Sequence, residues 1–118
     1  MPFRFEELKV WHQAVDLSND IDLLAKSFPA IERFSLTSQI KRAADSVVLN
    51  IAEGSTGQSK AEFARFINIA LRSAIEVVAC LYLASKRNLI KAEQYKKYYV
   101  DYEVLCKMLT GLRSSLKE

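Results

Sequence analysis

His12, Asp16 and Asp20 follow one another at four-residue intervals, and imidazole and carboxylate groups bind metal ions or transfer protons. On a helix this spacing would bring all three side chains to one face. The sequence contains no Glu-x-x-His or Cys-x-x-Cys pair to complete a metal site, and no nucleophile elbow or glycine-rich phosphate loop. We therefore expect a solvated helix face here, with no metal, no cofactor and no enzymatic activity.

A second group of polar residues lies in the middle of the chain and could form a pocket or a buried network. It comprises Gln39, Arg42, Ser46, Asn50 and Glu53, at spacings of three or four, and then Ser73 and Glu76. On a helix Arg42 would reach Asp45 or Ser46, and Arg72 would pair with Glu76. We favour hydrogen bonds that fix the register of two helices. A polar pocket, or part of the central surface of an oligomer, is the alternative.

Basic residues gather in the second half of the chain, whereas residues 5–28 are net acidic. The candidate contacts to a nucleic-acid backbone are Arg65, Arg72, Lys86, Lys91, Lys96 and Lys97. Cations bind phosphates, and exposed aromatic rings can stack on bases. Of the tyrosines around these lysines, only Tyr99 falls outside the apolar stripe of its helix, which gives little support for stacking. Ordinary solvated faces, or electrostatic docking between subunits, are the alternatives.

Four helices would position these residues, and the sequence predicts them over residues 5–28, 36–53, 60–87 and 92–116. Each carries apolar residues at alternating spacings of three and four, which is the period of an amphipathic helix. In the first helix the stripe is Val10, Ala14, Leu17, Ile21, Leu24 and Phe28. The stripe of the fourth helix includes three tyrosines, at positions 95, 98 and 102.

Local signals indicate where these helices begin and end. Ser35 is the expected N-cap of the second helix, and Ser59 with Glu62 has the spacing of a capping box for the third. Gly54 stands where a helix often ends in a left-handed residue. The third helix is expected to end near residues 87–88.

The predicted fold class is all-α, a left-handed up-down-up-down four-helix bundle that forms one domain over residues 1–118. The chain has only three Gly and two Pro, and short connections make sequential helices antiparallel. Cys80 and Cys106 would lie about 10 Å out of register on neighbouring helices, which argues against a disulfide and fits a reducing compartment. With no signal-peptide pattern and no run of about 18 apolar residues, we expect a soluble, cytoplasmic protein that enters no membrane.

The third helix is apolar around most of its circumference, although a surface helix of a monomeric bundle usually has a wide polar face. The apolar residues beyond its core stripe that we assign to an interface are Leu71, Ile75, Val78, Tyr82 and Leu89. We predict that they join the subunits of a homo-oligomer, since partners usually cover apolar patches of this kind. The alternative is that this helix is the most buried member of a monomer.

Several short motifs in the chain resemble the family of 23S rRNA intervening-sequence proteins. They are Leu8-x-Val-Trp11, Phe28-Pro29, Phe34-x-Leu36-x-x-Gln39, Arg42-Ala-Ala-x-Ser46, Asn50-Ile-Ala-Glu-Gly54 and Glu62-Phe63-x-x-Phe66, with Ser73 and Glu76 further on. The resemblance spans nearly the whole chain, and Asn-Ile-Ala-Glu-Gly with Arg-Ala-Ala upstream is its most specific part. It implies an up-down four-helix bundle that assembles into a homopentameric ring, in a family without established enzymatic activity.

Relatives within this resemblance include proteins encoded inside insertions of bacterial 23S rRNA genes and accessory variability proteins of diversity-generating retroelements. The resemblance therefore implies a homo-oligomer, of pentameric size, whose basic surface binds RNA or DNA. The alternative function is a protein-interaction scaffold that binds no nucleic acid and docks a partner such as a reverse transcriptase.

Overall fold

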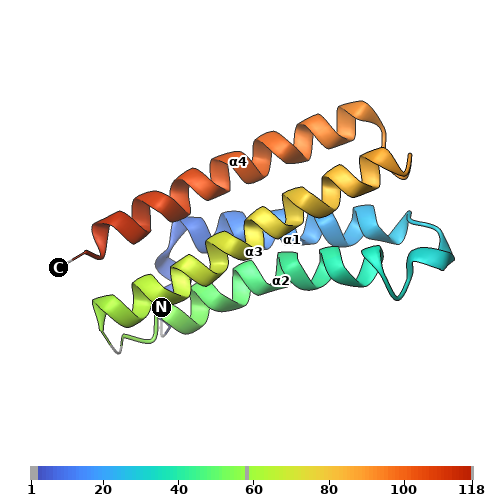
Figure 1. Ribbon diagram of the computed structural model, residues 1–118. Helices are drawn as coiled ribbons and strands as arrows, with labels where there is room; N and C mark the ends of the chain where they lie inside the picture. The colour runs from blue at the N-terminus through green and yellow to red at the C-terminus, as the bar shows by residue number, and fades with distance from the viewer. Residues whose placement is uncertain (1–2, 58, 118) are drawn as a thin grey trace.

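The computed structural model describes residues 3–57 and 59–117, and its fold is all-α, which confirms the predicted class. Its elements are the 3-10 helix η1 (Arg4–Glu7), α1 (Lys9–Lys26), the 3-10 helix η2 (Ala30–Glu32), α2 (Leu36–Gly54), α3 (Lys60–Lys86) and α4 (Ala92–Ser115). Each α-helix packs against the next one in sequence, and α1 also contacts α4 (Figure 1). The helices therefore form an up-down bundle.

The first helix is shorter than its apolar stripe suggested, and it begins at Lys9 rather than near residue 5. Leu8 has an extended backbone (φ −91°, ψ 116°), so the residues before it form the separate 3-10 helix η1. The N–H of Leu8 donates to the carbonyl of Phe5 over 3.0 Å and closes that turn. At its other end α1 stops at Lys26, two residues before Phe28. The other three helices end within one residue of the predicted positions.

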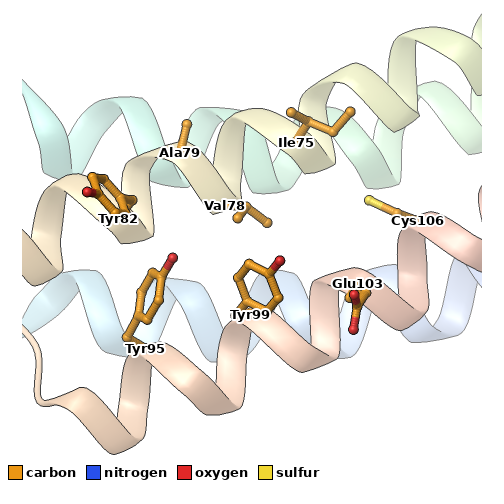
Figure 2. A pocket seen from close by; sticks show the side chains of 8 residues that line it. All are labelled: Ile75, Val78, Ala79, Tyr82, Tyr95, Tyr99, Glu103 and Cys106. Carbon is orange, nitrogen blue, oxygen red and sulfur yellow. The ribbon is translucent and has the colours of Figure 1, made fainter.

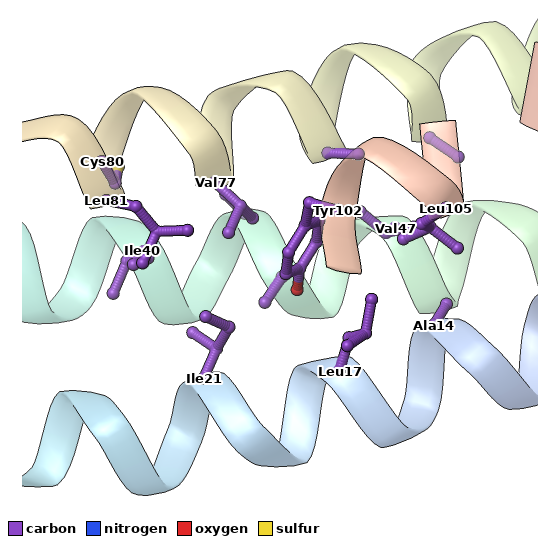
Figure 3. Packing of buried hydrophobic residues seen from close by; sticks show 14 of the residues in the cluster. Ala14, Leu17, Ile21, Ile40, Val47, Val77, Cys80, Leu81, Tyr102 and Leu105 are labelled. Atoms are coloured by element: carbon purple, nitrogen blue, oxygen red, sulfur yellow. The ribbon is translucent and has the colours of Figure 1, made fainter. Parts of the chain in front are cut away.

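The core is built from the apolar stripes of the four helices. On α1, α2 and α3 the stripe residues are buried, and Ile21, Ile40 and Ile67 are fully inaccessible to solvent. Tyr102 of α4 lies among side chains from the other three helices (Figure 3), and this burial raises the pKa of its hydroxyl strongly. At the start of α4 the apolar stripe is not fully buried, because Tyr95 is only partly covered by the core.

The helices α2 and α3 come very close together where α2 ends. A Cβ placed on Gly54 would lie 2.6 Å from the Cβ of Phe66 and 3.0 Å from the Cδ1 of Phe63. Gly54 is the last residue of α2 and does not have the left-handed conformation that its position suggested. The left-handed glycine is Gly57, in the following connection, with φ 87°. Gly54 is therefore required by close packing and not by backbone conformation.

The two serines expected to cap helices behave differently. The Oγ of Ser59 accepts a hydrogen bond from the N–H of Glu62 over 3.0 Å and so caps α3. Ser35 precedes α2, but its side chain does not cap that helix. Its hydroxyl donates instead to the carboxylate of Glu32 over 2.9 Å. The start of α2 is thus tied to the preceding connection.

The chain reverses between α3 and α4 through Asn88, which lies in the left-handed region with φ 59°. The N–H of Leu89 donates to the carbonyl of Ala84 over 2.9 Å, and the N–H of Asn88 donates to the carbonyl of Ser85 over 3.1 Å. These two bonds form a Schellman motif, which satisfies carbonyls at the end of α3. The motif directs α4 back along α3.

By length and composition alone, α3 is apolar enough to cross a membrane. This corrects the expectation that no segment of the chain reaches that limit. In the bundle, however, α3 contributes Phe63, Ile67, Val77 and Leu81 to the interior. It is a core helix of a compact bundle, and its hydropathy reflects that position.

Candidate functional site

One hydrogen bond of the predicted polar set, between Ser46 and Ser73, joins α2 to α3 below the surface, and Asn50 bonds Ser46 from within α2. The hydroxyls of Ser46 and Ser73 lie 2.9 Å apart. The side-chain amide of Asn50 donates to the carbonyl of Ser46 over 2.8 Å and to its hydroxyl over 3.0 Å. All three side chains are half-buried, and the bond between Ser46 and Ser73 favours one register of α2 against α3.

The rest of this polar set lies nearer the surface. The amide of Gln39 donates to the carboxylate of Glu76 across the helix pair, over 3.4 Å. Arg42 donates to the hydroxyl of Ser38 over 3.0 Å, rather than to Asp45 or Ser46. Within residues 3–57 and 59–117, the expected ion pair between Arg72 and Glu76 is not formed.

Glu53 is exposed at the far end of this line. A hollow of about 170 Å³ is lined by Gln39, Arg42, Ala43, Ser46, Ser73 and Glu76. Pockets that hold small molecules usually measure about 300–1,000 Å³, so this one is small for a ligand.

His12 is also used structurally. Its Nε2 lies 2.7 Å from the carbonyl oxygen of Glu6, and its ring packs edge-on against Trp11. These contacts tie η1 to the start of α1. Among the residues that the structure describes, no group of three or more His, Cys, Asp or Glu side chains could hold a metal ion.

An apolar groove runs between α3 and α4 on the outside of the bundle (Figure 2). Its volume is about 420 Å³, and its walls are Ile75, Val78, Ala79 and Tyr82 of α3 and Tyr95, Tyr99, Glu103 and Cys106 of α4. Ile75, Tyr82 and Tyr99 are 56%, 51% and 42% exposed, so the groove presents aliphatic and aromatic surface to water. The rings of Tyr82 and Tyr95 meet edge-on at a centroid distance of 6.3 Å.

The α3 wall of this groove contains three of the five residues predicted for an oligomer interface, namely Ile75, Val78 and Tyr82. The other two, Leu71 and Leu89, lie outside the groove. Both are partly buried and pack against the core. The interface set is thus divided between the groove and the interior.

The α4 wall was not predicted from the sequence. The spacing predicts Tyr95 for the core stripe, and Cys106 enters the sequence analysis only through the argument against a disulfide. The signal that could have located this wall is a second line at positions 95, 99, 103 and 106, which Glu103 interrupts. Val100 and Val104, which are 46% and 45% exposed, add apolar surface to the same helix.

The two cysteines are free thiols. Burial, together with a smaller contribution from the nearby carboxylate of Glu76, raises the pKa of Cys80 to about 11. Burial also raises the pKa of Cys106, with a smaller contribution from Glu103. Both thiols are therefore protonated at neutral pH and are poor nucleophiles.

The six cations predicted to contact nucleic acid do not form one patch. Arg65 and Lys86 stand near opposite ends of α3, separated by about 32 Å at the helical rise per residue. Arg65 pairs with Glu62 at 2.7 Å, and Lys97 pairs with Asp101 at 2.9 Å. These hydrogen-bonded carboxylates raise the pKa of both cations. Arg72 is exposed midway along α3.

The remaining predicted cations do gather, at the end of the bundle where α3 turns into α4 (Figure 1). The ion pair between Glu32 and Arg87, at 3.3 Å, brings the α1–α2 connection to the same end. We define the basic end as Arg33, Lys86, Lys91 and Lys96. All four side chains are exposed, and none forms an ion pair within the described parts of the chain.

The family model of the 23S rRNA-intervening sequence protein matches residues 6–111 of the chain. The chain belongs to this family. A crystal structure of a protein of unknown function from the S23 ribosomal protein family of Bacteroides thetaiotaomicron is similar to it, with 29% identity and a TM-score of 0.83. The match covers 89% of this chain and 95% of that one. No curated protein matches the chain.

Several of the residues that resemble this family in sequence meet where α2 packs on α3, whereas Phe34 of the α1–α2 connection, which also belongs to the resemblance, is exposed. Gly54 leaves room for Phe66, and Ser46 bonds Ser73. The 23S rRNA-intervening sequence protein family has no known catalytic activity. Of the signature residues, Gly54 allows the close approach of the two helices, and Ser46 and Ser73 are hydrogen-bonded between them.

Proposed function

We propose that the protein is a non-enzymatic homo-oligomer of pentameric size that binds RNA or DNA through its basic end. The observation that carries self-association is the open apolar groove between α3 and α4. A monomer would leave the side chains of Ile75, Tyr82 and Tyr99 facing water. Single exposed apolar residues are ordinary, whereas a contiguous patch is usually covered by a partner. Tyrosine is also enriched in the cores of protein interfaces.

Light scattering or sedimentation at micromolar concentration tests this self-association. We expect a mass that is a multiple of the 13.4 kDa chain, with a pentamer as the specific expectation. The mass of a single chain at that concentration would refute the proposal.

The basic end supports contact with nucleic acid. It presents four cations that no carboxylate within residues 3–57 and 59–117 neutralises. Each copy in an oligomer would add its own set, and affinity for a phosphate backbone rises with the number of cations engaged. The description of the family names an intervening sequence of 23S rRNA, which makes structured RNA the first polymer to test.

Binding of a fluorescent structured RNA at about 50 mM and about 200 mM salt tests this second part, because phosphate contacts weaken as salt rises. The double substitution Lys86→Gln/Lys91→Gln is expected to lower affinity and flatten the salt dependence. Lys9→Gln/Lys60→Gln is the matched control, since it removes two exposed cations at the opposite end.

If the protein does not bind RNA at low salt, or if both double variants lose the same amount of RNA affinity, the basic end is ruled out as an RNA site. Recovery of a stoichiometric protein from nuclease-treated lysate would then favour the scaffold function. A reverse transcriptase is the partner that the family resemblance suggests for that case.

A further inference from the structure

The connection between α1 and α2 carries two large apolar side chains that the folded chain leaves in water. Ile31 is 88% exposed and Phe34 is 89% exposed. The guanidinium of Arg33 lies over the Phe34 ring, 5.4 Å from its centroid. Two such side chains on one short connection are unlike the scattered exposed residues of an ordinary surface. We call this protrusion, residues 31–34, the knob.

Hydrogen bonds hold the knob in place. The N–H of Glu32 donates to the carbonyl of Pro29 over 2.9 Å. The carboxylate of Glu32 accepts from the hydroxyl of Ser35 over 2.9 Å and from the guanidinium of Arg87 over 3.3 Å. Side chains presented on an ordered backbone lose less conformational entropy on binding. The knob is therefore preorganised for contact.

The knob and the groove lie on opposite sides of the bundle and at the same end. In the described chain, α1 packs on α2 and α4, and α3 packs on α2 and α4, without an α1–α3 or α2–α4 contact. The α1–α2 edge therefore faces away from the α3–α4 edge. The α1–α2 connection and the α3–α4 turn share one end of the bundle (Figure 1). Tyr82 in the groove is only about 6 Å from the end of α3.

We propose that the knob of one copy occupies the α3–α4 groove of a second copy; this contact rests on the self-association proposed above. The two surfaces face opposite ways within one chain, but they meet when copies stand side by side and point in the same direction. The groove volume of about 420 Å³ falls within the range of pockets that enclose bound groups. The tyrosines of the groove offer ring edges and faces to Phe34 (Figure 2).

Charge favours the same arrangement. Glu103 stands in the groove wall, and within the described residues neither it nor Arg33 of the knob has an ion-pair partner. The contact pairs these two groups. On a larger scale, the net acidic residues 5–28 lie on the knob side and the net basic residues 59–117 supply the groove side. Aromatic and Arg side chains are also the commonest anchors of protein interfaces.

The geometry of the contact determines the kind of assembly. The knob and the groove are different patches, so the interface is heterologous and each copy uses both. A series of such contacts ends only when it closes into a ring. Because the copies point in the same direction, their basic ends gather on one rim of that ring, where Lys86, Lys91 and Lys96 stay free while Arg33 pairs with Glu103 of the next copy.

A complementation experiment tests the contact. Phe34→Asp removes the knob and keeps the groove, whereas Ala79→Arg fills the groove and keeps the knob; both positions are exposed. Each variant alone is expected at the mass of one chain, 13.4 kDa, by light scattering at micromolar concentration. Their equimolar mixture is expected at twice that mass, because one intact knob enters one intact groove and no further contact is possible.

The matched controls place the same side chains at the opposite end of the bundle. Phe3→Asp and Ala61→Arg alter exposed residues and are expected to keep the wild-type mass. A wild-type protein of one chain would overturn self-association and the contact together. An oligomeric wild type whose Phe34→Asp and Ala79→Arg variants remain oligomeric, or whose mixed variants form no two-chain species, would overturn the contact alone.

Discussion

Replacing Gly54 by Ala tests the close approach of α2 and α3. At an exposed helical position the same change adds about 0.5–1 kcal/mol of stability. At Gly54 the new Cβ would lie 2.6 Å from the Cβ of Phe66 and 3.0 Å from the ring of Phe63. Overpacking costs about 1–3 kcal/mol, and the upper half of that range applies because the Cβ of Phe66 cannot rotate away. We expect a net loss of about 1–2.5 kcal/mol in the free energy of unfolding.

Urea denaturation followed by circular dichroism measures this loss. The protein concentration must be the same throughout, because association between copies adds to apparent stability. Gly111 supplies the matched control, since a Cβ added there meets no atom within 4 Å. Gly111→Ala is expected to gain about 0.5–1 kcal/mol. If Gly54→Ala is as stable as the wild type, or gains stability as Gly111→Ala does, the close-packing argument is wrong.

Four further substitutions are expected to alter stability to different extents, and the same denaturation assay measures each. Ser59→Ala removes the cap of α3 and should cost about 1 kcal/mol, whereas Ser35→Ala should cost less than half as much because its hydroxyl caps nothing; equal losses would contradict this. Ser46→Ala removes the partner of the half-buried Ser73 hydroxyl and one of the two bonds of Asn50, so it should cost about 1–2 kcal/mol, and an unchanged midpoint would contradict this. In the folded protein Cys80 has a pKa of about 11, against an ordinary value of 9.0. Because folding favours the protonated thiol, its contribution to the free energy of unfolding is complete below pH 9 and is lost as the pH rises to 11. Cys80→Ala should therefore lose less stability than the wild type over that interval, and parallel pH profiles would argue against a buried thiol.

The helical spacing of apolar residues was sufficient to predict the fold. Ile21, Ile40 and Ile67 each belong to a line of apolar residues at intervals of three and four, and each helix has one such line that must face inward. Short connections then leave an antiparallel bundle as the simplest arrangement. The role of Gly54 could not be predicted, because it depends on Phe66, a side chain that reaches it from another helix.

The candidate site was only partly predictable for a related reason. Ile75, Val78 and Tyr82 exceed what one core stripe needs, and that surplus is visible in the sequence. Tyr95 has the spacing of a core residue, and only the rotation of α4 in the bundle places it on the groove wall. The exposure of Phe34 was also hidden, since a connection has no periodicity that shows which side chains face water.

The packing of α2 on α3 also bears on how the chain folds. Only residues 55–59 separate the two helices, so closing this loop costs little entropy. We expect the α2–α3 hairpin to form the folding nucleus, with α1 and α4 docking afterwards. Gly54→Ala should then act mainly on the refolding limb of a chevron plot and leave the unfolding limb nearly unchanged. Gly54, where two of the chain's most family-like segments meet, would in that case govern how fast the bundle forms.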